Sequence, residues 1–142
     1  MSDRLFEDVD IGDEFPPCHD QVSNERVRHF LGVRGSSEVD GRFTSLDAAK
    51  ALGLPRLLVP GPLLAGIMAR AVREWLPRGR LAKLDIVFRR NVWQDAPFVV
   101  EGVVVDAEER EEGPAVDIDL TVLDEHGDRC VTGSSTVFLA RR

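Results

Sequence analysis

The chain has 142 residues, of which 43% are apolar and 30% are charged, and its formal net charge is −7. This length suits one globular domain, residues 1–142, because domains most often have about 100–150 residues. The negative charge disfavours a nucleic-acid partner, and no stretch approaches the roughly 20 apolar residues that cross a bilayer. The N-terminus, "MSDRLFEDVD", is unlike a signal peptide, so we predict a cytoplasmic protein with no membrane partner.

The cysteines and histidines give no metal motif. Cys18 and Cys130 lie far apart in the sequence, and neither belongs to a Cys-x-x-Cys pair. His19, His29 and His126 are also widely spaced, without the grouping that ligands of one metal ion show. We therefore predict reduced thiols, no metal site and no cofactor.

The N-terminal third is predicted to contain one strand and one helix. Phe6, Val9 and Ile11 precede "GDEF" and two prolines, a pattern that predicts a short N-terminal strand and a turn. In "SNERVRHFLGV", Ser23 is a suitable N-cap for a short helix that ends near Gly32.

A second short helix and one long helix follow. Thr44 and Asp47 resemble a capping box before "LDAAKAL", which ends at Gly53. Pro62 suits the first turn of a longer helix, which Pro77 closes. Apolar residues recur along this helix at spacings of three and four, namely Leu63, Leu64, Ile67, Met68, Ala71, Val72, Trp75 and Leu76.

The rest of the chain is predicted to be antiparallel sheet. Alternating or Val-rich segments cover residues 83–89, 97–108, 116–123 and 129–140, with turn-like links between the last three. Together with the long helix they predict an α+β domain in which the helix packs on one sheet face. One helix cannot cover both edges of such a sheet, so we expect dimerisation through a strand edge.

Several segments in this order resemble a known family. "FEDVDIGDEFPP", "AAKALGLPRLLVPGPLLAGIM", "LDIVFRRNV" and "VVEGVVVDA" are similar to the MaoC-type dehydratases and hydratases. The resemblance implies a hot-dog fold: one long central helix wrapped by an antiparallel sheet of about five strands, with short flanking helices. It also implies an acyl-CoA or acyl-carrier-protein thioester substrate, and a homodimer or a heterodimer with another hot-dog subunit.

The resemblance also places the family's site residues. Active members use an Asp and, five residues later, a His, and these positions fall here on Glu38 and Phe43. A His-Gly pair before the long helix becomes Pro60 and Gly61, and a Ser within that helix becomes Ala69. The backbone donor of the glycine is kept, whereas a phenyl ring cannot move a proton. Phe43, Pro60, Gly61 and Ala69 are therefore predicted to bind substrate.

The segment "RFTSLDAAKALGLPRLLVPGPL" resembles one branch more closely. In two-subunit and fused double-hot-dog dehydratases, including the mycobacterial fatty-acid elongation type, one hot dog carries the Asp and His and the other lacks them. The hot dog that lacks the Asp and His chiefly shapes the acyl tunnel. This resemblance favours a non-catalytic partner subunit at least as strongly as an enzyme.

Three hypotheses follow. The leading one is a hydro-lyase that acts on 3-hydroxyacyl or enoyl thioesters, alone or as a dehydratase subunit, with Arg89 and Arg90 near the phosphates of the carrier. The second is a non-catalytic acyl-binding partner in a heteromeric dehydratase. The third is an isomerase or cyclase in a biosynthetic pathway, with Glu38 or Asp40 as a lone base whose pKa burial would raise.

Overall fold

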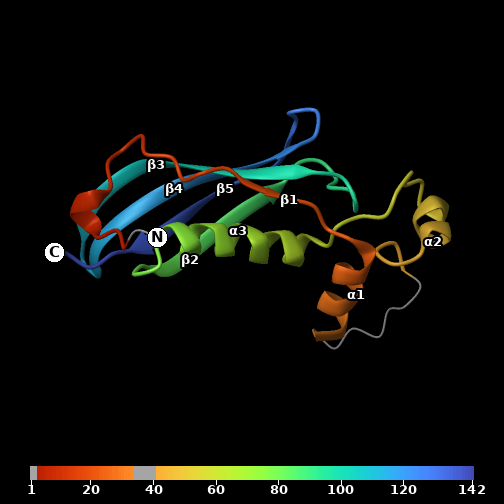
Figure 1. Ribbon diagram of the computed structural model, residues 1–142, viewed down its shortest axis with the longest axis horizontal. Coiled ribbons are helices and arrows are strands. Elements are labelled where there is room, and N and C mark those ends of the chain that lie inside the picture. The colour runs from red at the N-terminus through yellow and green to blue at the C-terminus, as the bar shows by residue number, and fades with distance from the viewer. Residues whose placement is uncertain (1–2, 34–40) are drawn as a thin grey trace.

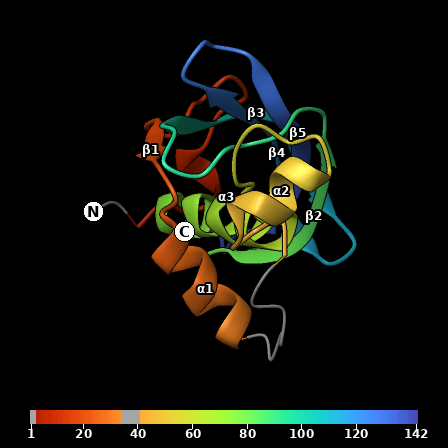
Figure 2. The same cartoon turned by 90° about the vertical axis from the view of Figure 1, so that its right-hand side faces the viewer.

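The computed structural model describes residues 3–33 and 41–142. A five-stranded antiparallel sheet, in the order β1-β3-β4-β5-β2, curls around helix α3, Gly61–Trp75 (Figures 1 and 2). The strands are β1 Cys18–Asp20, β2 Arg80–Phe88, β3 Phe98–Arg110, β4 Gly113–Asp124 and β5 Arg129–Phe138. The predicted α+β architecture, a long helix on one face of an antiparallel sheet, is confirmed.

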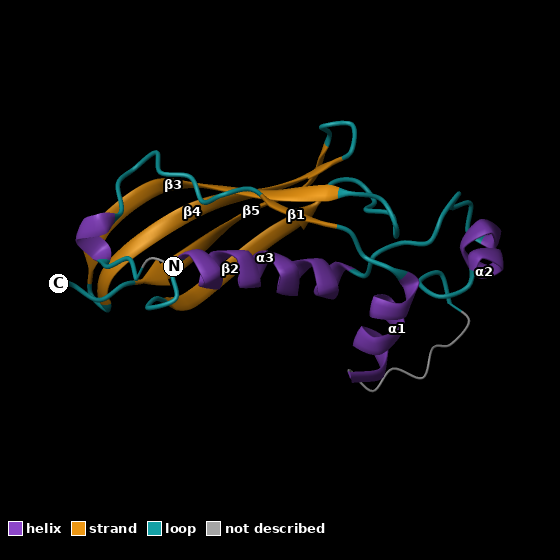
Figure 3. Cartoon of the chain, viewed as in Figure 1, coloured by secondary structure: helices purple, strands orange, loops and turns teal. Residues whose placement is uncertain are grey.

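The two short α-helices lie together beyond one end of the sheet, near the start of α3 (Figure 3). They are α1, Asn24–Val33, and α2, Leu46–Ala51. The Ser23 hydroxyl accepts the Arg26 N–H at 3.2 Å, which confirms the predicted cap of α1. A 3-10 turn, η1 (Phe6–Asp8), lies at the opposite end of the molecule.

Helix α3 forms the centre of the core. Its sheet-facing residues recur at spacings of three and four and are buried, namely Leu64, Met68, Ala71, Val72 and Trp75. They pack against apolar side chains of β3, β4 and β5, including Val100, Val116, Ile118, Leu120, Val122 and Val131. Burial of this stripe fixes the helix on the sheet, and so fixes where its first turn lies.

The predicted strand around Phe6, Val9 and Ile11 is wrong. Asp8 turns the chain back on itself, because its carboxylate accepts the Leu5 N–H at 3.0 Å and η1 forms instead. The strand β1 starts only at Cys18, after two prolines that have no N–H to donate to a ladder.

The predicted capping box of α2 is also wrong by one residue. The N-cap is Ser45, whose hydroxyl accepts the Ala48 N–H at 3.3 Å. The Thr44 carbonyl meanwhile accepts a hydrogen bond from Arg28 Nη2 at 3.1 Å. A tertiary hydrogen bond to Thr44 therefore accompanies the shift of the cap from Thr44 to Ser45.

Strand β2 forms one margin of the sheet and pairs only with β5 among the described strands. Near its end, Val87 is 53% exposed and Phe88 is 52% exposed. None of the described helices is both long and apolar enough to cross a membrane.

Candidate functional site

A cavity of about 220 Å³ opens at the first turn of α3. It brings together Phe43, from the segment before α2, and Gly61, the first residue of α3. The other lining residues come from the link into α3, from the end of β2 and from the loop after it, namely Arg42, Leu58, Val59, Leu64, Phe88, Arg90, Asn91 and Val92. Two residues that the sequence assigned to substrate binding thus line one cavity.

Gly61 offers this cavity a backbone donor. The N-terminal N–H groups of a helix lack partners within the helix, and α3 satisfies two of them locally: Leu63 and Leu64 both donate to the Pro60 carbonyl, at 3.1 and 3.2 Å. Pro62 has no N–H. The Gly61 N–H has no acceptor among residues 3–33 and 41–142, so it is the donor that remains at the positive end of the helix dipole.

The Phe88 ring lies directly against Gly61. A Cβ built on Gly61 would be 2.9 Å from Phe88 Cζ, so no side chain fits there without moving the ring. Glycine therefore permits close approach of β2 to the first turn of α3. Phe88 is half-exposed, and its ring forms a wall of the cavity beside Gly61.

Phe43 gives the cavity an apolar wall and carries no proton-transfer group. Its ring is partly buried against the core, and the Arg42 guanidinium stacks over it with Cζ 4.5 Å from the ring centre. The position that the resemblance assigns to histidine is thus filled by an aromatic–cation pair. This pair can hold an apolar chain or an anionic group, but it cannot act as a general acid or base.

Gln94 holds the backbone of this cavity in place, and no sequence motif marks this residue. Its side chain is 3% exposed, and Nε2 donates to the carbonyls of Phe43 at 2.7 Å and Leu58 at 2.6 Å. Its Oε1 accepts from Asn24 Nδ2 at 2.9 Å. One buried amide thereby joins the segment that carries Phe43 to the segment that leads into α3.

Helix α1 completes this network. Asn24 Nδ2 also donates to the Phe43 carbonyl at 3.2 Å, and Asn24 Oδ1 accepts from Arg28 Nε at 2.8 Å. Arg28 in turn donates to the Thr44 carbonyl. Helix α1 therefore helps to hold the backbone of residues 43 and 44, beside the cavity that Phe43 lines.

The two arginines proposed for phosphates take different positions. Arg90 lines the cavity, and its Nη1 lies 3.8 Å from Asp128 Oδ2 in an exposed ion pair. Arg89 Nε donates to Thr132 Oγ1 at 2.8 Å, on β5. Arg42, which the sequence did not single out, lines the same cavity as Arg90.

The remaining predicted site residues stay predictions. Glu38 and Asp40 lie outside the described residues. Pro60 is the buried N-cap of α3, and its carbonyl accepts the Leu63 and Leu64 N–H groups at the start of the helix. Ala69 lies further along α3 and is partly buried.

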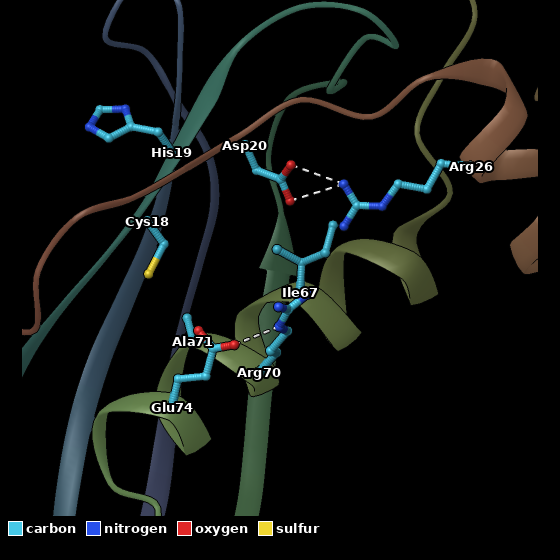
Figure 4. Close-up of a pocket in the computed structure, with 8 residues that line it drawn as sticks. All are labelled: Cys18, His19, Asp20, Arg26, Ile67, Arg70, Ala71 and Glu74. Atoms are coloured by element: carbon cyan, nitrogen blue, oxygen red, sulfur yellow. Dashed lines mark hydrogen bonds and ion pairs between the residues drawn. The ribbon is translucent and has the colours of Figure 1, made fainter. Parts of the chain in front are cut away.

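A larger cavity lies elsewhere, between α3 and β1, and measures about 410 Å³ (Figure 4). Its charges are paired with each other: Arg26 with Asp20 at 2.9 Å, and Arg70 with Glu74 at 2.7 Å. Burial raises the pKa of the Cys18 thiol, and the nearby Glu74 carboxylate raises it further. A thiol that stays protonated is a poor nucleophile, so the cavity at Gly61 has the clearer chemistry.

No metal centre is formed by the part of the chain that is described. Within residues 3–33 and 41–142, no three His, Cys, Asp or Glu side chains are grouped so that they could hold a metal ion.

Comparison with known proteins places the chain by its fold. No family description and no curated protein sequence matches it. Among solved structures, an (R)-hydratase from A. caviae involved in PHA biosynthesis is 19% identical, with a TM-score of 0.81 over 92% of this chain and 97% of that one. A MaoC-like dehydratase from Rhodospirillum rubrum is 19% identical, with a TM-score of 0.81 over 98% of both chains.

A third solved structure is an assembly of two kinds of subunit. The C-terminally truncated HadBC complex from Mycobacterium tuberculosis, a (3R)-hydroxyacyl-ACP dehydratase, matches at 17% identity. Its TM-score is 0.75, over 89% of this chain and 95% of that one. The chain has the hot-dog fold, and its structural neighbours are MaoC-like dehydratases and (R)-hydratases.

Proposed function

We propose that the chain is a MaoC-like hot-dog protein that acts on 3-hydroxyacyl or enoyl thioesters as a hydro-lyase, alone or as a dehydratase subunit. The observation that carries this proposal is the Gly61 N–H, which lacks an acceptor among the described residues and lies at a cavity with apolar walls. The likeness in fold to hydratases and dehydratases supports it.

The reaction needs such a donor. Hydration of an enoyl thioester adds hydroxide at the β-carbon and a proton at the α-carbon, and dehydration reverses both steps. In either direction negative charge gathers on the thioester oxygen while the α-carbon lacks its proton. A backbone N–H at a helix start stabilises that charge, and loss of one such donor typically costs about 10²–10³-fold in rate.

The protons must be moved by groups other than Phe43. Dehydration requires a base for the α-proton and an acid that protonates the departing hydroxyl, so that water leaves. Glu38 and Asp40 are the carboxylates that we propose for this work within the chain. A partner subunit with an intact Asp and His is the alternative source.

A non-catalytic acyl-binding subunit is therefore the second candidate function. Phe43 favours it, because the resemblance assigns a histidine to this position and the phenyl ring instead gives the cavity an apolar wall. In this case Gly61 and Phe43 would hold the acyl thioester, while the partner would supply proton transfer. The exposed β2 margin fits either a homodimer or a heterodimer with another hot-dog subunit.

The substrate carrier is proposed to be coenzyme A or an acyl carrier protein. Both present phosphate groups at the end of a thioester arm. Arg42 and Arg90 line the cavity and would meet such phosphates at its mouth. An acidic carrier protein would approach this side of the molecule and avoid the acidic segment at residues 106–112.

The direct experiment is a turnover assay with enoyl-CoA and (R)-3-hydroxyacyl-CoA thioesters of several chain lengths. The purified protein is assayed alone and with a hot-dog protein that carries Asp and His. Interconversion by the protein alone supports the hydro-lyase, and interconversion that depends on the mixture supports the subunit. If both thioesters stay unchanged in every mixture, the hydro-lyase proposal fails.

A further inference from the structure

We infer that the groove between α3 and β1 is a second binding site, which takes an aromatic α-amino acid. The groove includes the cavity of about 410 Å³ described above, which is large enough for a small-molecule ligand. A cavity of about 270 Å³ adjoins it, because Cys18, Ala71 and Glu74 line both. The groove shares none of its described lining residues with the cavity at Gly61, so this inference goes beyond the proposed function.

One end of the groove has aromatic and apolar walls. Phe15, Pro16 and Trp75 line it, together with Arg4. The rings of Phe15 and Trp75 meet edge to face with their centres 6.0 Å apart, and the Arg4 guanidinium lies over the Trp75 ring, with Cζ 5.0 Å from the ring centre. A flat aromatic group suits these walls, because aromatic rings pack well against one another edge to face or offset.

The other end of the groove carries charges of both signs. Asp20 points from β1 toward α3, where Arg70 and Glu74 lie, and Arg26 reaches Asp20 from α1 (Figure 4). Two arginines and two carboxylates balance, so this end selects neither a simple anion nor a simple cation. A zwitterion is complementary to it, because its carboxylate can bind an arginine while its ammonium group binds a carboxylate.

The ion pairs that are present do not block this exchange. The side chains of Arg70 and Glu74 are 70% and 60% exposed, and Arg26 and Asp20 are partly exposed as well. Ion pairs that solvent reaches contribute little to stability, so each partner can turn to a charge on the ligand. Glu74 lines both cavities, and it therefore places the ammonium group where the charged end meets the aromatic end.

An aromatic α-amino acid combines these features in one small molecule. Its head carries both charges, and its ring follows one methylene group away. The head would lie between Arg70 and Glu74, and the ring would lie against Phe15 and Trp75. A peptide lacks this head, because its terminal ammonium and carboxylate groups are on different residues.

Isothermal titration with L-phenylalanine tests the whole ligand, and three analogues each lack one part of it. Phenethylamine lacks the carboxylate, hydrocinnamate lacks the ammonium group, and glycine lacks the ring. We expect the wild type to bind L-phenylalanine with a dissociation constant below about 1 mM. Each analogue should bind at least about tenfold more weakly, because it loses either a charged hydrogen bond or the burial of the ring.

Removal of single charges on α3 tests the contacts of the head. Arg70→Gln leaves a surplus carboxylate, so it should weaken L-phenylalanine binding about tenfold and strengthen that of phenethylamine. Glu74→Gln leaves a surplus arginine and should strengthen hydrocinnamate binding instead. Arg73→Gln is the matched control, since Arg73 is an exposed arginine of α3 that does not line the groove. Circular dichroism checks that each variant is folded.

Trp75 reports where the ligand binds. Trp93 is the other tryptophan of the chain, so the fluorescence of a Trp93→Phe variant comes from Trp75 and should change as L-phenylalanine binds. Unchanged fluorescence would overturn the inference, as would a wild type that does not bind L-phenylalanine at tens of millimolar. Equal affinity for L-phenylalanine, phenethylamine and hydrocinnamate, or equal behaviour of Arg70→Gln and Arg73→Gln, would also overturn it. No thioester is used, so these outcomes are independent of the proposed function.

Discussion

At the scale of single residues, Gln94 makes the strongest prediction. Its buried amide bonds to two backbone carbonyls and to Asn24. Gln94→Leu keeps a similar volume but leaves these polar groups without that partner. Because each unsatisfied buried group costs about 1–3 kcal/mol, we expect the free energy of unfolding to fall by about 2–4 kcal/mol. Urea denaturation followed by fluorescence measures this change.

Gln21→Leu is the matched control, because Gln21 is exposed and its substitution should change stability by less than about 0.5 kcal/mol. Equal stability of the two variants would show that the Gln94 hydrogen bonds do not hold the backbone around Phe43 as described. The Gln94 variant should also weaken thioester binding more than the control does, since Phe43 would lose its fixed backbone.

At this scale the predicted site residues came from a resemblance to a family. The resemblance of "AAKALG" and its neighbouring segments to MaoC-type proteins assigned substrate binding to Phe43 and Gly61. Both line one cavity, and their role in binding stays a prediction. Gln94 could not be found in this way, since it bonds to Phe43 across 51 positions and lies in a loop without periodicity. Arg42 was missed because a lone arginine beside a phenylalanine has no distinctive pattern.

At the scale of elements, α3 contains a glycine that its position does not require. Gly66 is exposed in the middle of the helix, and a Cβ there would meet no heavy atom within 4 Å. Gly66→Ala should stabilise the protein by about 0.5–1 kcal/mol, because alanine loses less backbone entropy in a helix. If the stabilisation is about 1 kcal/mol, the midpoint of thermal denaturation should rise by roughly 2–4 °C.

The same substitution on β3 should act in the opposite direction. A Cβ at Gly102 would lie 2.3 Å from the Phe15 ring, which is buried, so Gly102→Ala must displace that ring. A stabilised Gly102→Ala, or a destabilised Gly66→Ala, would contradict the packing described.

The elements that the sequence predicted correctly are those with long periodic patterns. Helix α3 and strands β2 to β5 have enough apolar positions to distinguish a period near 3.6 from a period of two. The N-terminal segment is too short for this, and Asp8 and the two prolines decide its course through local hydrogen bonding. The Ser45 cap is accompanied by a tertiary hydrogen bond from Arg28 to the Thr44 carbonyl, which no local motif encodes.

At the scale of the whole molecule, one carboxylate joins three strands and should affect acid stability. Asp117 on β4 accepts from Arg110 on β3 at 2.6 Å and from Thr136 on β5 at 2.7 Å. The hydrogen bond from Arg110, and then that from Thr136, lower the pKa of Asp117 against the opposing effect of burial. A lowered folded pKa contributes stability above the unfolded pKa, and this contribution is lost as pH falls through the folded value.

We therefore expect Asp117→Asn to be less stable than the wild type at pH 7. The difference should shrink below a pH of about 4, where an unfolded aspartate takes up its proton, and vanish once the folded carboxylate is protonated. Asp119→Asn, on the same face of β4 and exposed, serves as the control. Urea midpoints from pH 7 to pH 2 would test this, and a constant difference would argue against it.

The fold and the chemistry are carried by different parts of this molecule. The helix and sheet agree with hydratases and dehydratases at TM-scores of 0.75 to 0.81, although the sequences are only 17–19% identical. The fold depends on apolar periodicity, which many sequences satisfy. The site depends on a few positions, and in the site proposed for this chain Phe43 stands where the family resemblance assigns a proton-transfer group, while Gly61 keeps its backbone donor.

The central claim is that the Gly61 N–H binds the carbonyl oxygen of an acyl thioester, whether or not this chain also moves the protons. Gly61→Pro removes that N–H at the first helical position, and Gly61→Ala keeps the N–H; both variants place a Cβ against the Phe88 ring, so the comparison between them isolates the N–H. Isothermal titration with saturated acyl-CoA thioesters compares the wild type with both variants, and circular dichroism confirms their folding. We predict that Gly61→Pro weakens binding about tenfold relative to Gly61→Ala, as expected for one lost hydrogen bond. Equal affinity of the two variants, or no binding by the wild type, would contradict the claim.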